Sequence, residues 1–440
     1  MSESASAWPR GRWAIGVRSV WAGLDPDGFF RRRAGRSEPF TVVLPALGPV
    51  HFFARAESAR DILTAAATTM EAPTPNPIEP IIGKDSVILV SGEDHRRKRR
   101  MLLTALHGRR VRDLTDAMTR AARDESAHLR PGGRVALSAT ARSIALRVVI
   151  LAMFGVENAE RYDEFANVAT ALMQSNTSGL MLLPWLRKRF GGIGPWARLM
   201  RLRARFDELL AAQVDARRSD TSGRTVFGAL LAGCHATALD PEDLHQQLRT
   251  LVVAGHDTTA GALTWALYHI HREPRIRERV MAELDGASGP ESLPQLPYLT
   301  AVVSEALRMH PAVPIVMRRL TAPLTVNGVR YSPGNVLGIA VPAVHFDPAH
   351  WPDPHRFDPD RFLDKTPTPF EYLPFGGGFR RCPGASFATY ELAITIGTLL
   401  QTAEFAMPGR ELRRKPPRSV PCGIAVIPRR EVWLDVTRRL

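Results

Sequence analysis

The segment from Phe375 to Gly384 contains the residues whose types and spacing most clearly predict chemistry. It reads Phe-Gly-Gly-Gly-Phe-Arg-Arg-Cys-Pro-Gly and precedes an apolar stretch with helical periodicity. Three consecutive glycines allow a tight turn and a close approach of the backbone to something flat. Cys382 comes just before the expected helix N-terminus, where backbone N–H groups and the helix dipole favour a thiolate over a thiol. Arg380 supplies a cation able to pair with a carboxylate. A zinc site is disfavoured, because no second Cys or His lies at ligand spacing.

A second polar group lies inside an apolar segment. Residues 254–259 read Ala-Gly-His-Asp-Thr-Thr, in the middle of a stretch with helical periodicity over 244–272. Asp and Thr are poor helix-interior residues. A Thr hydroxyl can bond back to the preceding turn and open a bend in the helix. Such a groove would hold a ligand or a water molecule against the helix.

These segments, in this order, resemble the signatures of the cytochrome P450 family, and the resemblance covers the chain from about Phe40 to its end. The spacing of Phe375, Arg380, Cys382 and Gly384 resembles the family's cysteine loop. The resemblance implies that Cys382 is the axial ligand of the iron in haem b (iron protoporphyrin IX), with Phe375 and Arg380 in the haem-binding set. A thiolate ligand pushes electron density onto the iron and favours cleavage of the O–O bond.

The resemblance also implies roles for the polar group at 254–259, which is similar to the family's oxygen-binding helix. On this interpretation Gly255 makes room for dioxygen, while Asp257 and Thr258 relay protons to it. His256 is not part of the motif and is expected to be structural. Cys234 and Cys422 are expected to be small buried thiols without a chemical role.

Basic residues on other segments match the family's haem-propionate ligands. His95 and Arg99 lie four residues apart on one predicted helix, and they are implied to hold a propionate, a bidentate task that suits guanidinium. Arg318 is implied to reach the propionates as well, with Arg319 beside it as the competing choice. A buried structural network behind the haem, costly to break one partner at a time, is implied for Glu305, Arg308 and Arg361.

The activity that the resemblance implies is insertion of one oxygen atom from dioxygen into a C–H bond or a C=C bond. After Cys382 only a helix and a hairpin are expected before Leu440, so no fused reductase domain is expected. Electrons would then come from NAD(P)H through a separate acidic ferredoxin or flavodoxin-like partner. Two alternatives remain open: a peroxygenase or isomerase that uses the same haem, and a non-catalytic haem-based ligand-binding protein. The intact Asp257–Thr258 pair argues against the first, and the lack of a recognisable output domain argues against the second.

The substrate pocket implied by the resemblance is small, aliphatic and nearly free of charge, which indicates a lipophilic substrate such as a terpenoid, steroid, fatty acid or polyketide-like compound. Its expected lining residues are Val253, Ala254, Val313, Ile315 and Ile424. The stretch from Ser178 to Trp196 is expected to form a mobile lid over this pocket. Whether that lid touches a membrane surface is left open.

The elements that must position these residues are mainly helical. Helical periodicity runs from Asp94 to about Glu283, with further helices over 299–310 and 384–405. Short strands are expected near 40–43, 51–53 and 315–341, with turns at Asn327-Gly328 and Pro333-Gly334, and a closing hairpin over 420–436. The predicted fold class is mainly α with small β-sheets. The resemblance implies a single large triangular helical domain around a buried haem over residues 1–440, with 1–38 as a partly irregular N-terminal extension.

Composition limits the remaining possibilities. The 440 residues are 45% hydrophobic and 23% charged, as in a large globular protein, and no apolar run is long enough to span a bilayer. Three widely spaced cysteines argue against a disulfide framework. We therefore expect a cytoplasmic monomer without a transmembrane anchor. The formal net charge of +14 fits either an acidic protein partner or a solvated basic surface, and no nucleic-acid recognition motif is present.

Overall fold

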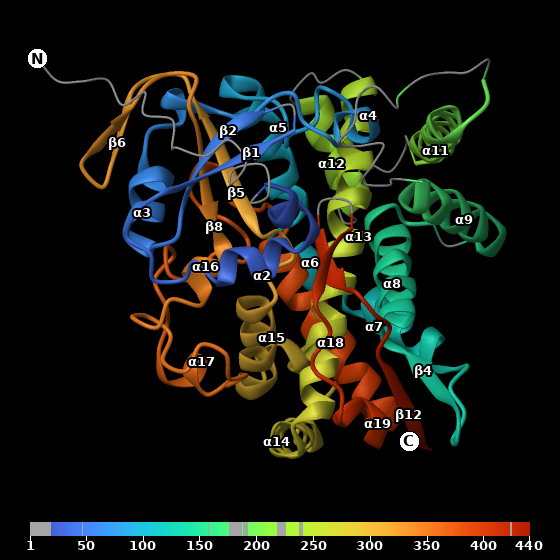
Figure 1. The fold of residues 1–440 in the computed structure, drawn as a ribbon. Helices are drawn as coiled ribbons and strands as arrows, with labels where there is room; N and C mark the ends of the chain where they lie inside the picture. Colours follow the sequence, from blue (N-terminus) through green and yellow to red (C-terminus); the bar gives the residue numbers. More distant parts are fainter. Residues whose placement is uncertain are drawn as a thin grey trace, which may run out of the picture.

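The computed structural model describes residues 19–45, 47–156, 158–175, 187, 192–217, 226–236, 241–422 and 425–440. Helices make up most of the chain; the largest sheet lies to one side of the helical body, and a smaller sheet that contains the C-terminal strand lies at the opposite edge (Figure 1). Within the described residues, no helix is both long and apolar enough to cross a membrane. The predicted fold class is confirmed.

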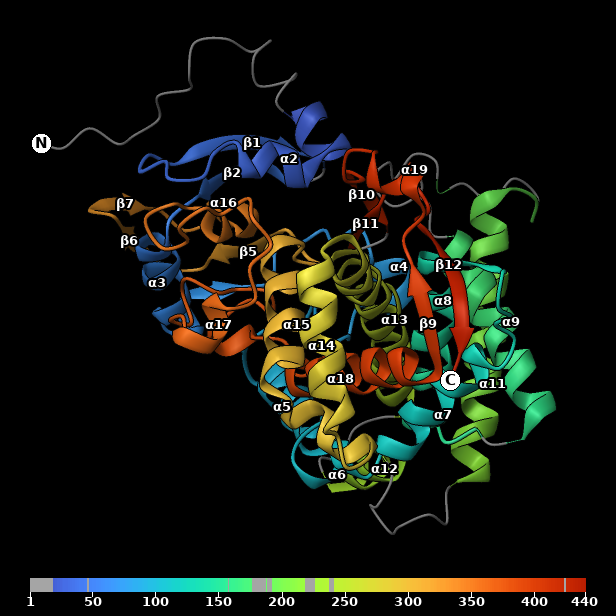
Figure 2. The same cartoon turned by 90° about the horizontal axis from the view of Figure 1, so that it is seen from below.

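The 32-residue helix α13 (Pro241–Arg272) passes through the main hydrophobic core, and Figure 2 shows it among the other long helices. It contacts α8 (Leu137–Val148), α15 (Pro297–Met309) and α18 (Ala385–Thr402). It ends where Glu273 precedes Pro274, because a residue before proline is driven to extended geometry. The other long helices are α5 (Gly92–Ala105), α7 (Thr115–Ser126), α9 (Ala159–Ser175), α11 (Pro195–Ala216), α12 (Val226–Ala236) and α14 (Pro274–Asp285).

The largest described sheet has the strand order β1-β2-β8-β5-β3. Its strands are β1 (Phe40–Leu44), β2 (Gly48–Phe53), β8 (Val336–Ala340), β5 (Ile315–Leu320) and β3 (Met70–Glu71). The β2–β8 pair is parallel and the others are antiparallel. The sheet holds β5 between β8 and β3, and this fixes the direction in which each β5 side chain points.

The predicted turn at Asn327-Gly328 is confirmed. It joins β6 (Leu324–Val326) to β7 (Val329–Tyr331), and both turn residues have positive φ, 49° and 76°. Two positive φ values define the type I′ turn, which Asn-Gly favours.

The structure differs from the sequence-based boundaries in three places. Within the helical periodicity expected from Asp94 to about Glu283, α8 ends at Val148 and the chain continues as the π-helical segment η2 (Val149–Met153). The C-terminal hairpin consists of β10 (Ser419–Cys422) and β11 (Ala425–Pro428), whereas β12 (Trp433–Arg439) pairs with β4 (Arg134–Ala136) and β9 (Ala403–Ala406). The expected N-terminal extension is partly folded: α2 (Pro26–Arg31) buries two Phe side chains against the large sheet.

Candidate functional site

The cysteine loop is held by backbone hydrogen bonds and by its glycines. The N–H of Cys382 donates to the carbonyl of Phe375 at 2.9 Å. Gly376 and Gly378 have φ values of +63° and +65°, which disfavour any other residue. A Cβ at Gly378 would lie 2.4 Å from the carbonyl oxygen of Leu63 in α3 (Ala56–Thr64). The close approach that Gly378 permits within the protein is therefore to α3, and the approach of this loop to a flat group stays a prediction.

The burial of Cys382 opposes the thiolate that the helix N-terminus was expected to favour. Helix α18 begins only at Ala385, three residues further on. Burial raises the pKa of Cys382, and this effect outweighs the backbone N–H of Gly384 and the charges of Arg99 and Arg381, which lower it. A metal ion that binds the sulfur displaces the proton directly, so the raised pKa is compatible with ligation.

Four basic side chains from three elements gather beside this loop. His95 and Arg99 come from α5, Arg318 from β5, and Arg380 from the short 3₁₀ helix η5 (Gly378–Arg380). The Phe379 ring centroid lies 5.9 Å from that of His95, and 5.7 and 5.6 Å from the guanidinium carbons of Arg318 and Arg380. Burial, followed by the charges of Arg380, Arg99 and Arg318, lowers the pKa of His95 to about 4. The imidazole is therefore neutral at pH 7.

The three arginines of this cluster have no carboxylate within ion-pair distance among the residues that the structure describes. Arg318 donates to the carbonyls of Met317 (2.8 Å) and Gly377 (3.4 Å), and Arg380 donates to the carbonyl of Val90 (2.6 Å). The Nε of Arg380 is buried without a hydrogen-bond partner. Burial lowers the pKa of Arg318 to about 9 and that of Arg380 to about 10. Buried and half-buried cations without a carboxylate at ion-pair distance fit an acidic group that binds beside the cysteine, such as the two propionates of a haem.

Strand geometry separates Arg318 from Arg319. Successive side chains of a strand point to opposite faces, and Arg318 is 7% exposed on the face of the cation cluster. Arg319 points away, donates to the carbonyl of Thr74 and lies 3.9 Å from a carboxylate oxygen of Glu71. Of the two candidates, only Arg318 joins the cluster.

The polar group on α13 has the local geometry expected for a bent helix. The hydroxyl of Thr258 donates to the carbonyl of Ala254 at 2.5 Å, one turn earlier. A Cβ at Gly255 would lie 3.3 Å from Cγ2 of Val149, so this glycine faces η2 and lets the two helices pass closely. The role of Gly255 toward dioxygen stays a prediction.

Two residues that the sequence interpretation missed lie beside Asp257. The Cys422 Sγ lies 3.9 Å from its Oδ2, and the Arg142 Nε lies 4.0 Å from its Oδ1. Cys422 had been expected to be an inert buried thiol, and no motif marked Arg142. Because 165 residues separate Cys422 from Asp257, no local spacing could have shown this contact.

The predicted charge network is present, and its central pair is fully buried. Glu305 and Arg308 are 0% exposed, and Nε and Nη2 of Arg308 donate to the two carboxylate oxygens of Glu305 at 2.6 and 2.8 Å. The Nε of Arg361 donates to Oε1 of Glu305 at 3.2 Å. His345 completes the arrangement: its Nε2 accepts from the N–H of Leu373, so its Nδ1 carries the proton and donates to the carbonyl of Arg308. This network joins α15 to the segment that leads into the cysteine loop.

The predicted pocket residues differ in their exposure. Ala254 and Ile315 are partly exposed and Val313 is 36% exposed, which is compatible with facing a cavity. Val253 is 3% exposed and belongs to the main hydrophobic core, so it does not face open space. Ile424 lies outside the described residues, as does the expected lid over 178–196 apart from residues 187 and 192–196.

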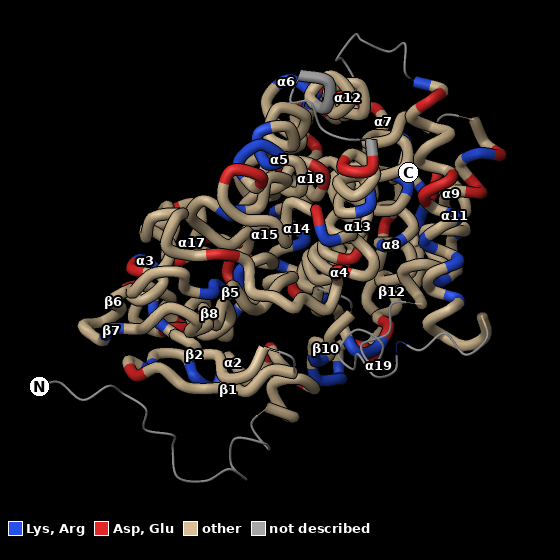
Figure 3. Tube along the Cα trace, turned by 90° about the horizontal axis from the view of Figure 1, so that it is seen from above, with Lys and Arg blue, Asp and Glu red and all other residues tan. Residues whose placement is uncertain are grey.

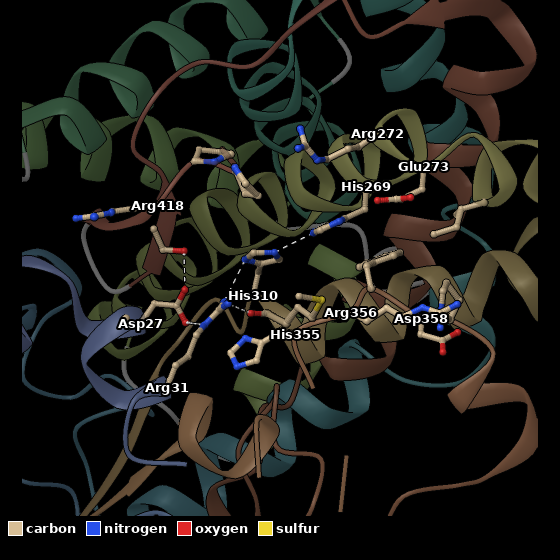
Figure 4. A pocket seen from close by; sticks show the side chains of 18 of the residues that line it. Asp27, Arg31, His269, Arg272, Glu273, His310, His355, Arg356, Asp358 and Arg418 are labelled. Carbon is tan, nitrogen blue, oxygen red and sulfur yellow. Dashed lines mark hydrogen bonds and ion pairs between the residues drawn. The ribbon is translucent and has the colours of Figure 1, made fainter. Parts of the chain in front are cut away.

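A cavity of about 550 Å³ lies elsewhere, between α2, the end of α13 and the end of α15 (Figure 4). None of the predicted site residues lines it. Its floor contains a hydrogen-bonded imidazole pair, with Nε2 of His310 and Nε2 of His269 3.0 Å apart. Arg31 can only donate to Nδ1 of His310, at 3.5 Å, so Nε2 of His310 carries the proton and donates to His269. The pair connects elements of the fold and takes no part in the cysteine site.

Comparison with known proteins places this geometry in one family. The family model for cytochrome P450 matches residues 25–434. A protein named cytochrome P450 138 from Mycobacterium tuberculosis is 30% identical over 380 residues, which cover 85% of this chain and 83% of the relative. Cytochrome P450 137 from the same species is 30% identical over 400 residues, covering 89% and 81%.

Solved structures show the same fold. A retinoic acid-bound cyanobacterial CYP120A1 aligns with a TM-score of 0.82 at 24% identity, covering 96% of both chains. The heme domain of cytochrome P450DA aligns with a TM-score of 0.79 at 20% identity, covering 96% of this chain and 93% of that one. With the cysteine loop, the cation cluster and the buried charge network in place, these matches show that the chain is a haem-dependent monooxygenase of the cytochrome P450 family.

Proposed function

We propose that this enzyme uses haem b, ligated by Cys382, to insert one oxygen atom from dioxygen into a C–H or C=C bond of a lipophilic small molecule. The observation that carries the proposal is the cluster of one buried and two half-buried arginines beside the cysteine loop, which lack a carboxylate within ion-pair distance among the described residues. When bound, haem b supplies dioxygen binding and the oxidising power for the reaction.

The cation cluster holds the two propionates in this proposal. Arg99, Arg318 and Arg380 donate to the carboxylates, and His95 contributes an N–H. Phe375 fixes the loop, since its carbonyl accepts from the N–H of Cys382.

The α13 residues supply protons. Asp257 is 8% exposed and stands next to Thr258, whose hydroxyl is anchored on the carbonyl of Ala254. An acid followed by a hydroxyl can pass protons inward from the surface, and the anchored hydroxyl keeps its oxygen at a fixed place on the helix wall. Thr258→Ala should keep the haem but release more of the reducing equivalents as hydrogen peroxide.

The substrate is proposed to be uncharged over most of its surface. Ala254, Val313 and Ile315 offer partly exposed apolar side chains. A site lined by such side chains binds its ligand mainly through apolar contacts. Terpenoids, steroids, fatty acids and polyketide-like compounds have this chemistry.

Electrons are proposed to come from NAD(P)H through a separate acidic ferredoxin or flavodoxin-like protein. Figure 3 shows Lys and Arg along α5 and near α6 (Arg109–Arg112). Arg96, Arg100, Arg112 and Arg381 are exposed, and the charge of Arg381 acts on Cys382, so this basic surface lies near the cysteine loop. An acidic partner would be steered to it, and its association rate would fall with salt.

The first test is the carbon monoxide difference spectrum of the dithionite-reduced protein. A Soret band at the thiolate position supports ligation by Cys382, and Cys382→Ala should abolish that band. A band at the unshifted haem position in the wild type would overturn the ligand assignment. The pyridine haemochromogen spectrum identifies haem b, and a spin-state shift measured over a panel of terpenoids, steroids and fatty acids then selects substrate candidates.

A further inference from the structure

Asp257 lies where three elements meet. Helix α8 packs along α13, and the β10–β11 hairpin lies across the same part of α13. Gly261 permits this contact, because an added Cβ would lie 3.3 Å from the carbonyl oxygen of Val426 in β11. The hairpin thereby brings Cys422, at the end of β10, onto the Asp257 carboxylate.

Each oxygen of this carboxylate faces a different partner. Oδ1 lies 4.0 Å from the Arg142 Nε of α8 and 3.2 Å from Nδ1 of the neighbouring His256, whereas Oδ2 faces the Cys422 thiol at 3.9 Å. The His256 contact does not have hydrogen-bond geometry, since its Nδ1 is buried without a partner. Among the described residues, Arg142 and Cys422 are therefore the two groups with a contact to this carboxylate from outside its own helix.

The Arg142 and Asp257 side chains differ in how much of each is exposed to solvent. The Arg142 side chain is 40% exposed, and the Asp257 side chain is 11% exposed. The guanidinium thus reaches from solvent to a nearly buried carboxylate that adjoins Thr258. A thiol is a weak hydrogen-bond donor. Cys422 can orient Oδ2 without holding it as firmly as a charged group would, which leaves the carboxylate able to turn toward Thr258.

We infer that Arg142 and Cys422 are positioning residues for Asp257, which orient its carboxylate between solvent and Thr258 during proton supply. The inference rests on the relay role of Asp257 and Thr258 proposed above. Loss of the thiol contact should increase peroxide release per NADPH by roughly 2- to 5-fold, as expected for one weak hydrogen bond.

The first experiment measures the contact itself and needs neither haem nor substrate. The rate at which iodoacetamide alkylates Cys422 is followed against pH by peptide mass spectrometry. Because the Asp257 charge raises the pKa of this thiol and the Arg142 charge lowers it, Asp257→Asn should shift the rate profile to lower pH and Arg142→Gln to higher pH. Arg147→Gln is the matched control, because Arg147 lies on the same helix but pairs with Asp124 at 2.9 Å. Equal profiles for the wild type and Asp257→Asn would overturn the inference.

The second experiment measures coupling in the holoenzyme. Peroxide formed per NADPH consumed is determined with a plant-type ferredoxin, its reductase and dodecanoic acid as the probe. Cys422→Ala and Arg142→Gln should raise this ratio, Cys422→Ser should restore it, and Arg147→Gln should leave it unchanged. Equal ratios for Cys422→Ser and Cys422→Ala would overturn the hydrogen-bond role.

Thr258→Ala separates the two proposals. If it leaves the ratio unchanged, the relay itself is refuted. If it raises the ratio while Cys422→Ala and Arg142→Gln do not, the relay stands and the positioning role is refuted. If Cys422→Ala and Arg142→Gln raise the peroxide ratio, the solvent deuterium isotope effect on NADPH-driven turnover should also rise in Arg142→Gln. Loss of packing alone would not produce this change.

Discussion

Glu305→Gln removes the one negative charge that neutralises Arg308 inside the protein. The guanidinium of Arg308 is 0% exposed, so water cannot replace the carboxylate. Two of its N–H donors, at 2.6 and 2.8 Å, lose a charged acceptor. Removal of one partner from a buried ion pair costs about 3–5 kcal/mol. Since 1.4 kcal/mol is a factor of ten, the ratio of folded to unfolded protein should fall by roughly 140- to 3700-fold.

The comparison variant is Arg361→Ala. The Arg361 side chain is 13% exposed, and Glu305 would keep both bonds from Arg308 as well as the N–H of Asp358. Its loss should therefore cost only about 1–2 kcal/mol. The assay is equilibrium unfolding in urea, followed by far-UV circular dichroism on both variants and the wild type. A cost below about 1 kcal/mol for Glu305→Gln, or equal costs for the two variants, would refute the view that an uncompensated buried charge dominates.

Three further predictions concern the haem cluster, the cysteine loop and the buried histidines. Arg318→Leu should weaken haem retention at least tenfold while Arg319→Leu should leave it near the wild type, as measured by haem transfer to apomyoglobin; equal losses would contradict the assignment of Arg318 to the propionates. Gly378→Ala should lower the midpoint of thermal unfolding, because φ is +65° and the new Cβ would meet the Leu63 carbonyl at 2.4 Å, and an unchanged midpoint would show that the loop can shift away from α3. Burial lowers the pKa of His345 to about 3. Between about pH 6.5 and 3, the imidazole of His345 is therefore protonated in the unfolded state and neutral in the folded state. Stability should fall as the pH falls through this window, and the slope of unfolding free energy against pH should be about one proton smaller in His345→Gln; an unchanged slope would show that His345 does not titrate on unfolding.

The sequence alone determined the features that depend on local spacing. The positions of Phe375, Arg380 and Cys382 identify the cysteine loop through their resemblance to the signature of the cytochrome P450 family. Asn327-Gly328 predicts a type I′ turn because few other residue pairs accept two positive φ values. The i,i+3 pair of Glu305 and Arg308 follows from helical geometry.

Only the tertiary structure decided which faces of distant segments meet. The pairing of β5 with β8 and β3 turns Arg318 toward Arg380 and Arg319 toward Glu71, although the two residues are adjacent in the sequence. The glycine at 378 proved to face α3, and burial outweighed the helix terminus at Cys382. The contact of Cys422 with Asp257 exists because a hairpin lies across α13. Spacing along the chain encodes which side chains share an element, whereas long-range contacts and desolvation depend on how the finished elements pack.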